Sequence, residues 1–144
     1  MEPEAVRRRV AVKAEPLDPS ALLAEVAEPS AGAIVLFVGT ARDHSHGKTG
    51  VTHLEYEAYP GVVVEKIDEV VAIAATKWDL IGVVVEHRVG EVAVGQPSVA
   101  VAVSSAHRDA AFEAGRFLID ELKARAPIWK KEHWPGGGEW VEGA

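Results

Sequence analysis

Residues 123–131 read Lys-Ala-Arg-Ala-Pro-Ile-Trp-Lys-Lys, and this stretch marks the change from a long helix to a terminal strand. Pro127 stops the helix because it has no backbone N–H and its ring clashes with the preceding turn. After it come residues 128–134, a Pro-Gly-Gly-Gly turn and residues 139–141, a pattern typical of a β-hairpin. The sequence therefore predicts a helix followed directly by a hairpin.

The same stretch is basic in an otherwise acidic protein. It carries four cations, Lys123, Arg125, Lys130 and Lys131, although the formal net charge of the chain is −7. Rigid and bulky residues lie between these cations, so the stretch differs from a plain solvated charge run. Clustered cations beside such residues indicate a pocket for an anionic ligand.

The composition indicates one globular domain over residues 1–144, because this length is the usual size of a domain. Hydrophobic residues make up 48% of the chain and charged residues 26%. The acidic balance argues against general nucleic-acid binding, which requires a basic face. The chain has no cysteine, which excludes disulfides, thiolate catalysis and cysteine-bound metals. Any sulfur chemistry must therefore draw its sulfur from a substrate or a partner.

The N-terminal segment and the apolar runs predict a cytoplasmic location without membrane contact. Residues 1–13 contain three consecutive arginines but no apolar stretch long enough for a signal peptide, and residues 1–8 are expected to be flexible. The longest apolar runs, 33–38 and 82–85, have the length of strands and are too short to span a membrane.

Apolar periodicity predicts helices over residues 19–27, 60–78 and 107–125, with Asp18 and Ser105 as caps of the first and last. The last helix carries an apolar stripe of Phe112, Gly115, Leu118, Ile119 and Leu122. Strands are expected at 9–13, 33–38, 51–58, 82–89, 92–94, 98–104, 128–134 and 139–141, and a polar, mobile loop at 39–50. Strands that are partly grouped and partly split by helices favour a two-layer α+β domain with a mixed or antiparallel sheet.

Lys123 and Lys130 are the first candidates for chemistry. Lys123 falls in the last helical turn, where a lone cation would merely complement the helix dipole. The turn at Pro127 allows Lys130 to return near Lys123, and two close ammonium groups depress each other's pKa. A lysine of this kind acts as a general acid or base, or as an amine nucleophile.

Arg42 lies in the polar loop just after a buried strand, where it can bind phosphate or carboxylate with its guanidinium fork. His44 and His46 share this loop, but no third ligand is spaced to complete a metal site with them. His87, Tyr56 and Tyr59 are interpreted as packing residues with satisfied hydrogen bonds.

His107 and Arg108 stand at the predicted start of the last helix, where free backbone N–H groups favour anions. From 107 to 123 is 16 positions, or about 24 Å along a helix. His107 and Lys123 of one chain therefore cannot serve one small-molecule site. Either there are two sites, or a second copy brings its His107 end to Lys123, as a twofold dimer can.

Five ordered blocks and a terminal Trp140-Val141-Glu142 cover most of the chain, from about Val10 to Glu142. The blocks are 37–42 (Phe-Val-Gly-Thr-Ala-Arg), 54–61 (Leu-Glu-Tyr-Glu-Ala-Tyr-Pro-Gly), 87–91 (His-Arg-Val-Gly-Glu), 105–108 (Ser-Ala-His-Arg) and 122–132 (Leu-Lys-Ala-Arg-Ala-Pro-Ile-Trp-Lys-Lys-Glu). With these blocks the chain resembles the large catalytic subunit of molybdopterin synthase, the MoaE family.

The resemblance implies an α/β hammerhead-type fold and a homodimer at the centre of a heterotetramer. Each end of the dimer would bind a small ubiquitin-like sulfur-carrier subunit, the MoaD-like partner, whose C-terminal Gly-Gly thiocarboxylate enters the pocket. Two sulfurs would pass to cyclic pyranopterin monophosphate, giving the dithiolene of molybdopterin. The resemblance implies neither a metal nor another cofactor in the large subunit.

By the same resemblance, Lys123 is the catalytic amine and Lys130 its helper at the substrate or the thiocarboxylate. Arg42 would hold the anionic substrate together with His107 and Arg108, which the helix length assigns to the second protomer. Phe37 would line the pocket wall. Some relatives carry an arginine soon after the Trp-Val-Glu motif, where this chain has Gly143 and Ala144, so Lys131 or Arg42 is expected to hold the substrate's phosphate.

Two other functions remain open from the sequence. One is a non-enzymatic anion-binding or regulatory module that keeps the fold and recruits a ubiquitin-like partner. The other is a different pterin- or nucleotide-phosphate enzyme that uses the same lysines. The presence of both Lys123 and Lys130 favours the sulfur-transfer enzyme over a scaffold, which would need neither.

Overall fold

The main sheet forms the centre of the molecule. In this computed structural model, which describes residues 5–45 and 48–141, the sheet has the strand order β1 (Arg7–Lys13), β6 (Leu80–Arg88), β8 (Pro97–Ser105) and β2 (Ala33–Thr40). β1 runs parallel to β6, whereas β6–β8 and β8–β2 are antiparallel. The mixed sheet predicted from the sequence is confirmed.

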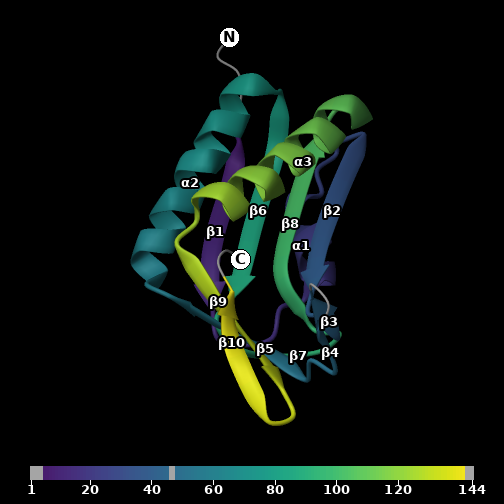
Figure 1. Ribbon diagram of the computed structural model, residues 1–144. Helices are drawn as coiled ribbons and strands as arrows, with labels where there is room; N and C mark the ends of the chain where they lie inside the picture. The colour runs from purple at the N-terminus through teal and green to yellow at the C-terminus, as the bar shows by residue number, and fades with distance from the viewer. Residues whose placement is uncertain (1–4, 46–47, 142–144) are drawn as a thin grey trace.

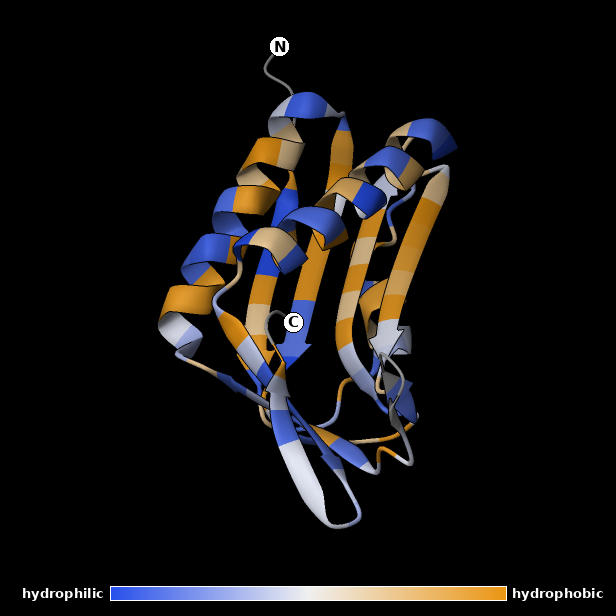
Figure 2. Cartoon of the chain, viewed as in Figure 1, coloured by the Kyte–Doolittle hydropathy of each residue, from blue (hydrophilic) through white to orange (hydrophobic). Residues whose placement is uncertain are grey.

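Helices cover both faces of the main sheet (Figure 1). α2 (Pro60–Lys77) and α3 (Arg108–Arg125) pack on one face, against β1, β2, β6 and β8, and α1 (Pro19–Val26) packs on the other. Alternate residues of a strand point to opposite faces. Val83, Val85, Val101 and Val103 thus belong to the core under α2 and α3, whereas Val84, Ala100 and Ala102 pack with Leu22 and Val26 of α1. β2, β6 and β8 are apolar along most of their length (Figure 2), whereas β1 begins with three arginines.

The second sheet lies below the main sheet in Figure 1. Its order is β10 (Gly137–Val141), β9 (Ile128–Trp134), β5 (His53–Ala58) and β7 (Gly90–Ala93), and all its pairs are antiparallel. A short ribbon of β3 (His44–Ser45) and β4 (Lys48–Thr49) follows β2. The predicted α+β class and the C-terminal hairpin are confirmed.

Several local predictions differ from the structure. Residues 1–8 were predicted to be flexible, but β1 begins at Arg7 and pairs with β6, so Arg7 and Arg8 belong to a strand. Residues 1–4 lie outside the described residues. β2 extends to Thr40, into the segment predicted as a loop. The Pro-Gly-Gly-Gly turn is shorter than predicted because β10 begins at Gly137.

Two predictions about α3 were wrong. Ser105 does not cap the helix: its hydroxyl donates to the carbonyl oxygen of Asp79 at 2.7 Å, because Ser105 is the buried last residue of β8, and His107 holds the N-cap position. Phe112 is not a core residue, since 63% of it is exposed, and the buried stripe runs instead through Ala111, Ala114, Gly115, Leu118, Ile119 and Leu122. Among the described residues, no helix is long and apolar enough to cross a membrane.

Candidate active site

A cavity of about 210 Å³ lies where the two sheets and the end of α3 meet. The end of β2, the start of β8, β5, β9 and the last turn of α3 all contribute to it. Its three cations are Arg42, Lys123 and Lys130. The remaining lining residues are Gly39, Thr40, Leu54, Tyr56, Ser98, Val99 and Leu122. The structure therefore brings together the two lysines and the arginine that the sequence predicted for one anion site.

The turn at Pro127 explains why the two lysines share this cavity. The N–H of Ala126 donates to the carbonyl of Leu122 at 2.9 Å and ends α3, and the N–H of Ile128 donates to the carbonyl of Ala126 at 2.8 Å. β9 then starts at once and pairs with β5, with Lys130 opposite Tyr56. Cross-strand partners face the same side of a sheet, so Lys130 points with Tyr56 into the cavity.

The surroundings of Lys130 lower its pKa. Burial of the half-buried side chain lowers the pKa of Lys130. The nearby carboxylate of Glu132 opposes this shift, whereas the positive charges of Lys123 and Arg42 lower the pKa further. Lys130 consequently gives up its proton more readily than a solvated lysine, which is the property required of a group that exchanges protons with a substrate.

Glu132 is a cavity neighbour that the sequence did not single out. It lies two residues after Lys130 on β9, hence on the same face of the strand, and only 2% of it is exposed. Its Oε2 atom is buried without a hydrogen-bond partner among the described residues. A buried carboxylate is costly unless a cation balances it, so Glu132 and the cavity cations stabilise each other. The strand period of two from Lys130 was the only signal for this position.

Tyr56, Ser98 and His87 form the wall behind Lys130. Burial raises the pKa of Tyr56, the Ser98 hydroxyl opposes this through a hydrogen bond, and the charge of Glu132 adds to it. The ring of His87 meets that of Tyr56 edge-on, with centroids 5.1 Å apart, and its Nδ1 donates to the carbonyl of Arg88 at 2.7 Å. Burial lowers the pKa of His87 to about 4, so this ring is neutral at pH 7. The geometry agrees with the interpretation of His87 as a packing residue.

Phe37 lines a neighbouring groove rather than the cavity itself. The groove, of about 480 Å³, runs between β2 and α3, and its apolar walls include Phe37, Phe112 and Ile119. Lys123 lines both the groove and the cavity. The groove therefore leads along α3 to the lysine pair.

The other predicted residues lie away from the cavity within one chain. Lys131 follows Lys130 on β9 and points to the opposite face of the second sheet, where its Nζ lies 5.6 Å from the centre of the Trp140 ring. His107 and Arg108 stand exposed at the other end of α3. His44 lies in β3 and His46 falls outside the described residues; the described part of the chain holds no cluster of potential metal ligands.

Comparisons with known proteins agree with this geometry. A family model described as "MoaE protein" matches residues 12–125. The chain belongs to the MoaE family. This MoaE-family chain is 49% identical over 111 residues to the molybdopterin synthase catalytic subunit of Salmonella typhimurium, an alignment that covers 77% of this chain and 73% of that protein. The resemblance inferred from the sequence blocks is confirmed.

Solved structures share the fold of this MoaE-family chain. Molybdopterin synthase from Staphylococcus aureus superposes with a TM-score of 0.86 and 32% identity, covering 91% of this chain and 95% of that one. A chain from Helicobacter pylori, solved as a protein–protein complex of subunits 1 and 2 of molybdopterin-converting factor, superposes with a TM-score of 0.77 over 92% of this chain and 90% of that one. At 22% identity, this second likeness concerns the fold alone.

Proposed function

We propose that this chain is the catalytic subunit of molybdopterin synthase. It would transfer sulfur to cyclic pyranopterin monophosphate and so form the dithiolene of molybdopterin. The observation that carries the proposal is the cavity in which Arg42, Lys123 and Lys130 meet, in a chain of the MoaE family. A cytoplasmic location is proposed with this function, on the sequence grounds given above.

The sulfur donor in this proposal is a separate small protein. The chain contains no cysteine, so the transferred sulfur comes from outside the chain. We propose a ubiquitin-like carrier subunit with a C-terminal Gly-Gly thiocarboxylate, and membership of the MoaE family supports such a pairing. The sulfur forms a bond to a substrate carbon, the bond from that carbon to oxygen breaks, and water hydrolyses the acyl group to leave a carrier carboxylate. Two such transfers complete the dithiolene.

The cavity residues suit the charges of this reaction. The substrate phosphate and the thiocarboxylate are both anions, and acyl hydrolysis passes through an oxyanion. Fixed cations in a partly dry cavity stabilise such charges more strongly than water does. We assign Lys123 as the catalytic amine, Lys130 as the group that exchanges protons beside it, and Arg42 as the phosphate or carboxylate ligand. The negative charge of Glu132 partly opposes the lowering of the pKa of Lys130.

A second protomer completes the site in this proposal. The groove along α3 exposes Phe37 and Phe112 and ends at Lys123. A second copy packed antiparallel in this groove would cover these rings and bring its His107 and Arg108 to the Lys123 end. Lys131 faces away from the cavity, so the partner protomer's cations and Arg42 remain to hold the phosphate. The assembly would be a central homodimer with one carrier at each end, a heterotetramer.

Reconstitution tests the function directly. The purified chain is mixed with its thiocarboxylated cognate small subunit and cyclic pyranopterin monophosphate, and the products are analysed by mass spectrometry. We expect the dithiolene product and two carrier carboxylates per product molecule. If a carrier that binds the chain yields no dithiolene under any tested condition, the enzyme assignment is wrong.

A further inference from the structure

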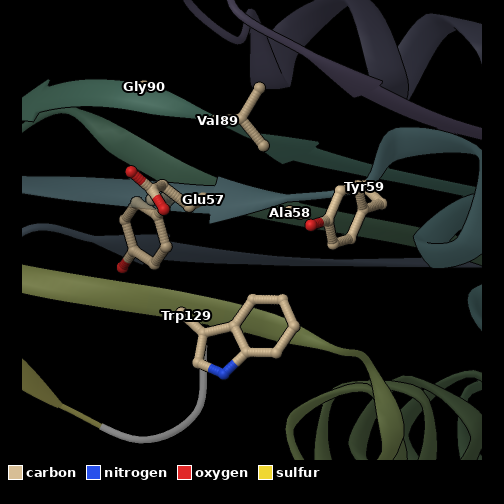
Figure 3. A pocket seen from close by; sticks show the side chains of 7 residues that line it. Glu57, Ala58, Tyr59, Val89, Gly90 and Trp129 are labelled. Carbon is tan, nitrogen blue, oxygen red and sulfur yellow. The ribbon is translucent and has the colours of Figure 1, made fainter.

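A second opening, of about 480 Å³, lies on the outer face of the second sheet and is not used by the proposed chemistry. Glu57, Tyr59, Val89 and Trp129 are among the residues around it (Figure 3). Glu57 pairs with Trp129 across β5 and β9, one position from the Tyr56–Lys130 pair. Because neighbouring residues of a strand face opposite sides, Glu57 and Trp129 face away from Lys130, and Tyr56 lines both this opening and the lysine cavity. We call it the aromatic–acid cleft.

Two aromatic rings of the cleft are exposed on rigid parts of the fold. Tyr59 is 73% exposed and Trp129 46% exposed. Tyr59 immediately precedes α2, and its carbonyl accepts the N–H of Val63 at 3.1 Å, which fixes its backbone. Trp129 is held by the β5–β9 ladder. Exposed aromatic rings on fixed backbone are typical of binding surfaces, because their burial requires little loss of conformational freedom.

The chemistry of the cleft fits an organic cation. The faces of tyrosine and tryptophan rings attract lysine and arginine side chains, and the carboxylate of Glu57 adds a negative charge to the same cleft. Two basic residues adjoin cleft residues along the chain. Lys130 follows Trp129 but lines the lysine cavity. Arg88 precedes Val89, but its Nε donates to the carbonyl of Ala14 at 3.3 Å and its Nη1 to Oε1 of Gln96 at 2.9 Å. We therefore expect the cation for the cleft to come from another molecule.

We propose that the aromatic–acid cleft binds an arginine or lysine side chain of the sulfur-carrier subunit and anchors that subunit beside the lysine cavity. The proposal rests on the proposed function for the identity of the partner. The net charge of −7 favours a partner with a basic contact face.

Trp129 is adjacent to Lys130, so the cleft and the cavity are separated by the thickness of one sheet. An extended tail of six residues covers about 20 Å, which exceeds the spacing of about 10 Å between packed sheets. The groove at Phe37 stays available for the second protomer.

The test measures carrier binding with the full-length chain. The dissociation constant of the thiocarboxylated cognate small subunit is determined by calorimetry for the wild type, for Glu57→Gln and for Trp129→Leu. We expect each substitution to weaken binding about fivefold or more. The effect of Glu57→Gln should shrink in 0.5 M salt, because an exposed charge pair is screened. At saturating carrier the single-turnover rate should equal that of the wild type.

Glu65→Gln is the matched control, because it removes the same charge from the exposed face of α2 and should leave binding unchanged. Wild-type affinity in both cleft variants would overturn the proposal. So would equal weakening by Glu65→Gln, since the effect would then be one of net charge. Calorimetry measures binding without turnover, so the two proposals can fail separately. If the cleft variants bind the carrier weakly but no dithiolene forms, only the enzyme function is refuted. If dithiolene forms but the cleft variants bind with wild-type affinity, only the cleft proposal is refuted.

Discussion

At the scale of single residues, Lys130 shows how the fold changes the chemistry of one side chain. Its stem is half-buried on β9, and two further cations line the same cavity. Burial and these charges lower its pKa, and the carboxylate of Glu132 partly opposes this shift. The folded protein therefore disfavours the charged form of Lys130 relative to water. This lowers the stability of the fold but suits a group that exchanges protons.

This cost predicts a pH-dependent gain in the variant Lys130→Met. The folded-state pKa lies below the unfolded value, so at neutral pH the unfolded chain holds the Lys130 proton more strongly than the folded chain does. The free energy of unfolding of the wild type should therefore rise as the pH passes from the folded pKa towards about 10.5. Lys130→Met should be the more stable protein at pH 7, with a gain that shrinks as the pH rises across that range.

Urea unfolding at a series of pH values measures this difference. Lys131→Met, on the other face of the same strand, is the control for changes in overall charge. A difference between Lys130→Met and the wild type that stays constant from pH 7 to pH 10.5 would show that the side chain carries no burial penalty.

The residues of the site were predictable to different degrees. Lys123, Lys130 and Arg42 could be found because a proline between two lysines and an arginine after a buried strand are visible in the sequence. Glu132 and Ser98 could not, because their importance comes from burial beside groups on other strands. Lys131 was assigned to the substrate, but the strand alternation that brings Lys130 into the cavity points Lys131 away from it.

At the scale of elements, the connections between strands and helices place the site. Pro19, Pro60 and Pro127 mark the starts of α1 and α2 and the end of α3, and proline restricts backbone geometry in a way that sequence reasoning can use. Phe112 has the helical spacing of a core residue, yet it lies at a groove that no described part of the chain covers. Apolar periodicity identifies the apolar side of a helix, but it does not show how far along the helix the neighbouring elements cover that side.

The backbone between β8 and α3 packs closely against Gly32. A Cβ atom at this position would lie 2.3 Å from the carbonyl oxygen of Ala106, which is backbone and cannot simply turn aside. Gly32→Ala should lower the free energy of unfolding by about 2 kcal/mol. Gly61→Ala, in the first turn of α2, meets no atom within 4 Å and should instead raise it by about 0.5 kcal/mol.

Urea denaturation of both glycine variants compares these effects. The two substitutions add the same methyl group, so an opposite sign of the two changes isolates the contact with Ala106. Equal stability of the two variants would mean that the Gly32 contact relaxes without cost.

At the scale of the whole molecule, one chain does not bring all the predicted anion ligands together. His107 and Arg108 stand at one end of α3 and Lys123 at the other. The exposed groove along the same helix provides a surface on which a second copy could pack and supply the missing cations. The sequence pointed to this arrangement through the length of the helix alone, whereas the groove that makes it possible appears only in the folded chain.

Hybrid dimers test the shared site. Dimers of Lys123→Ala and of Arg108→Ala are mixed under conditions that allow subunit exchange. A hybrid dimer has one site with both defects and one intact site, so equal mixing should restore about a quarter of the wild-type activity. Activity is followed as dithiolene formation, and exchange is verified by native mass spectrometry. No recovery despite verified exchange would show that each site belongs to one chain.

The most direct test of the central claim is the single-turnover rate of Lys123→Ala in the reconstituted reaction. Lys123 lines the cavity at the end of α3 and is assigned as the catalytic amine. We predict that its removal slows dithiolene formation about a hundredfold or more, while the chain still binds its carrier with wild-type affinity. Lys66→Ala, a lysine exposed on α2, should leave the rate unchanged. Turnover by Lys123→Ala at the wild-type rate would contradict the account.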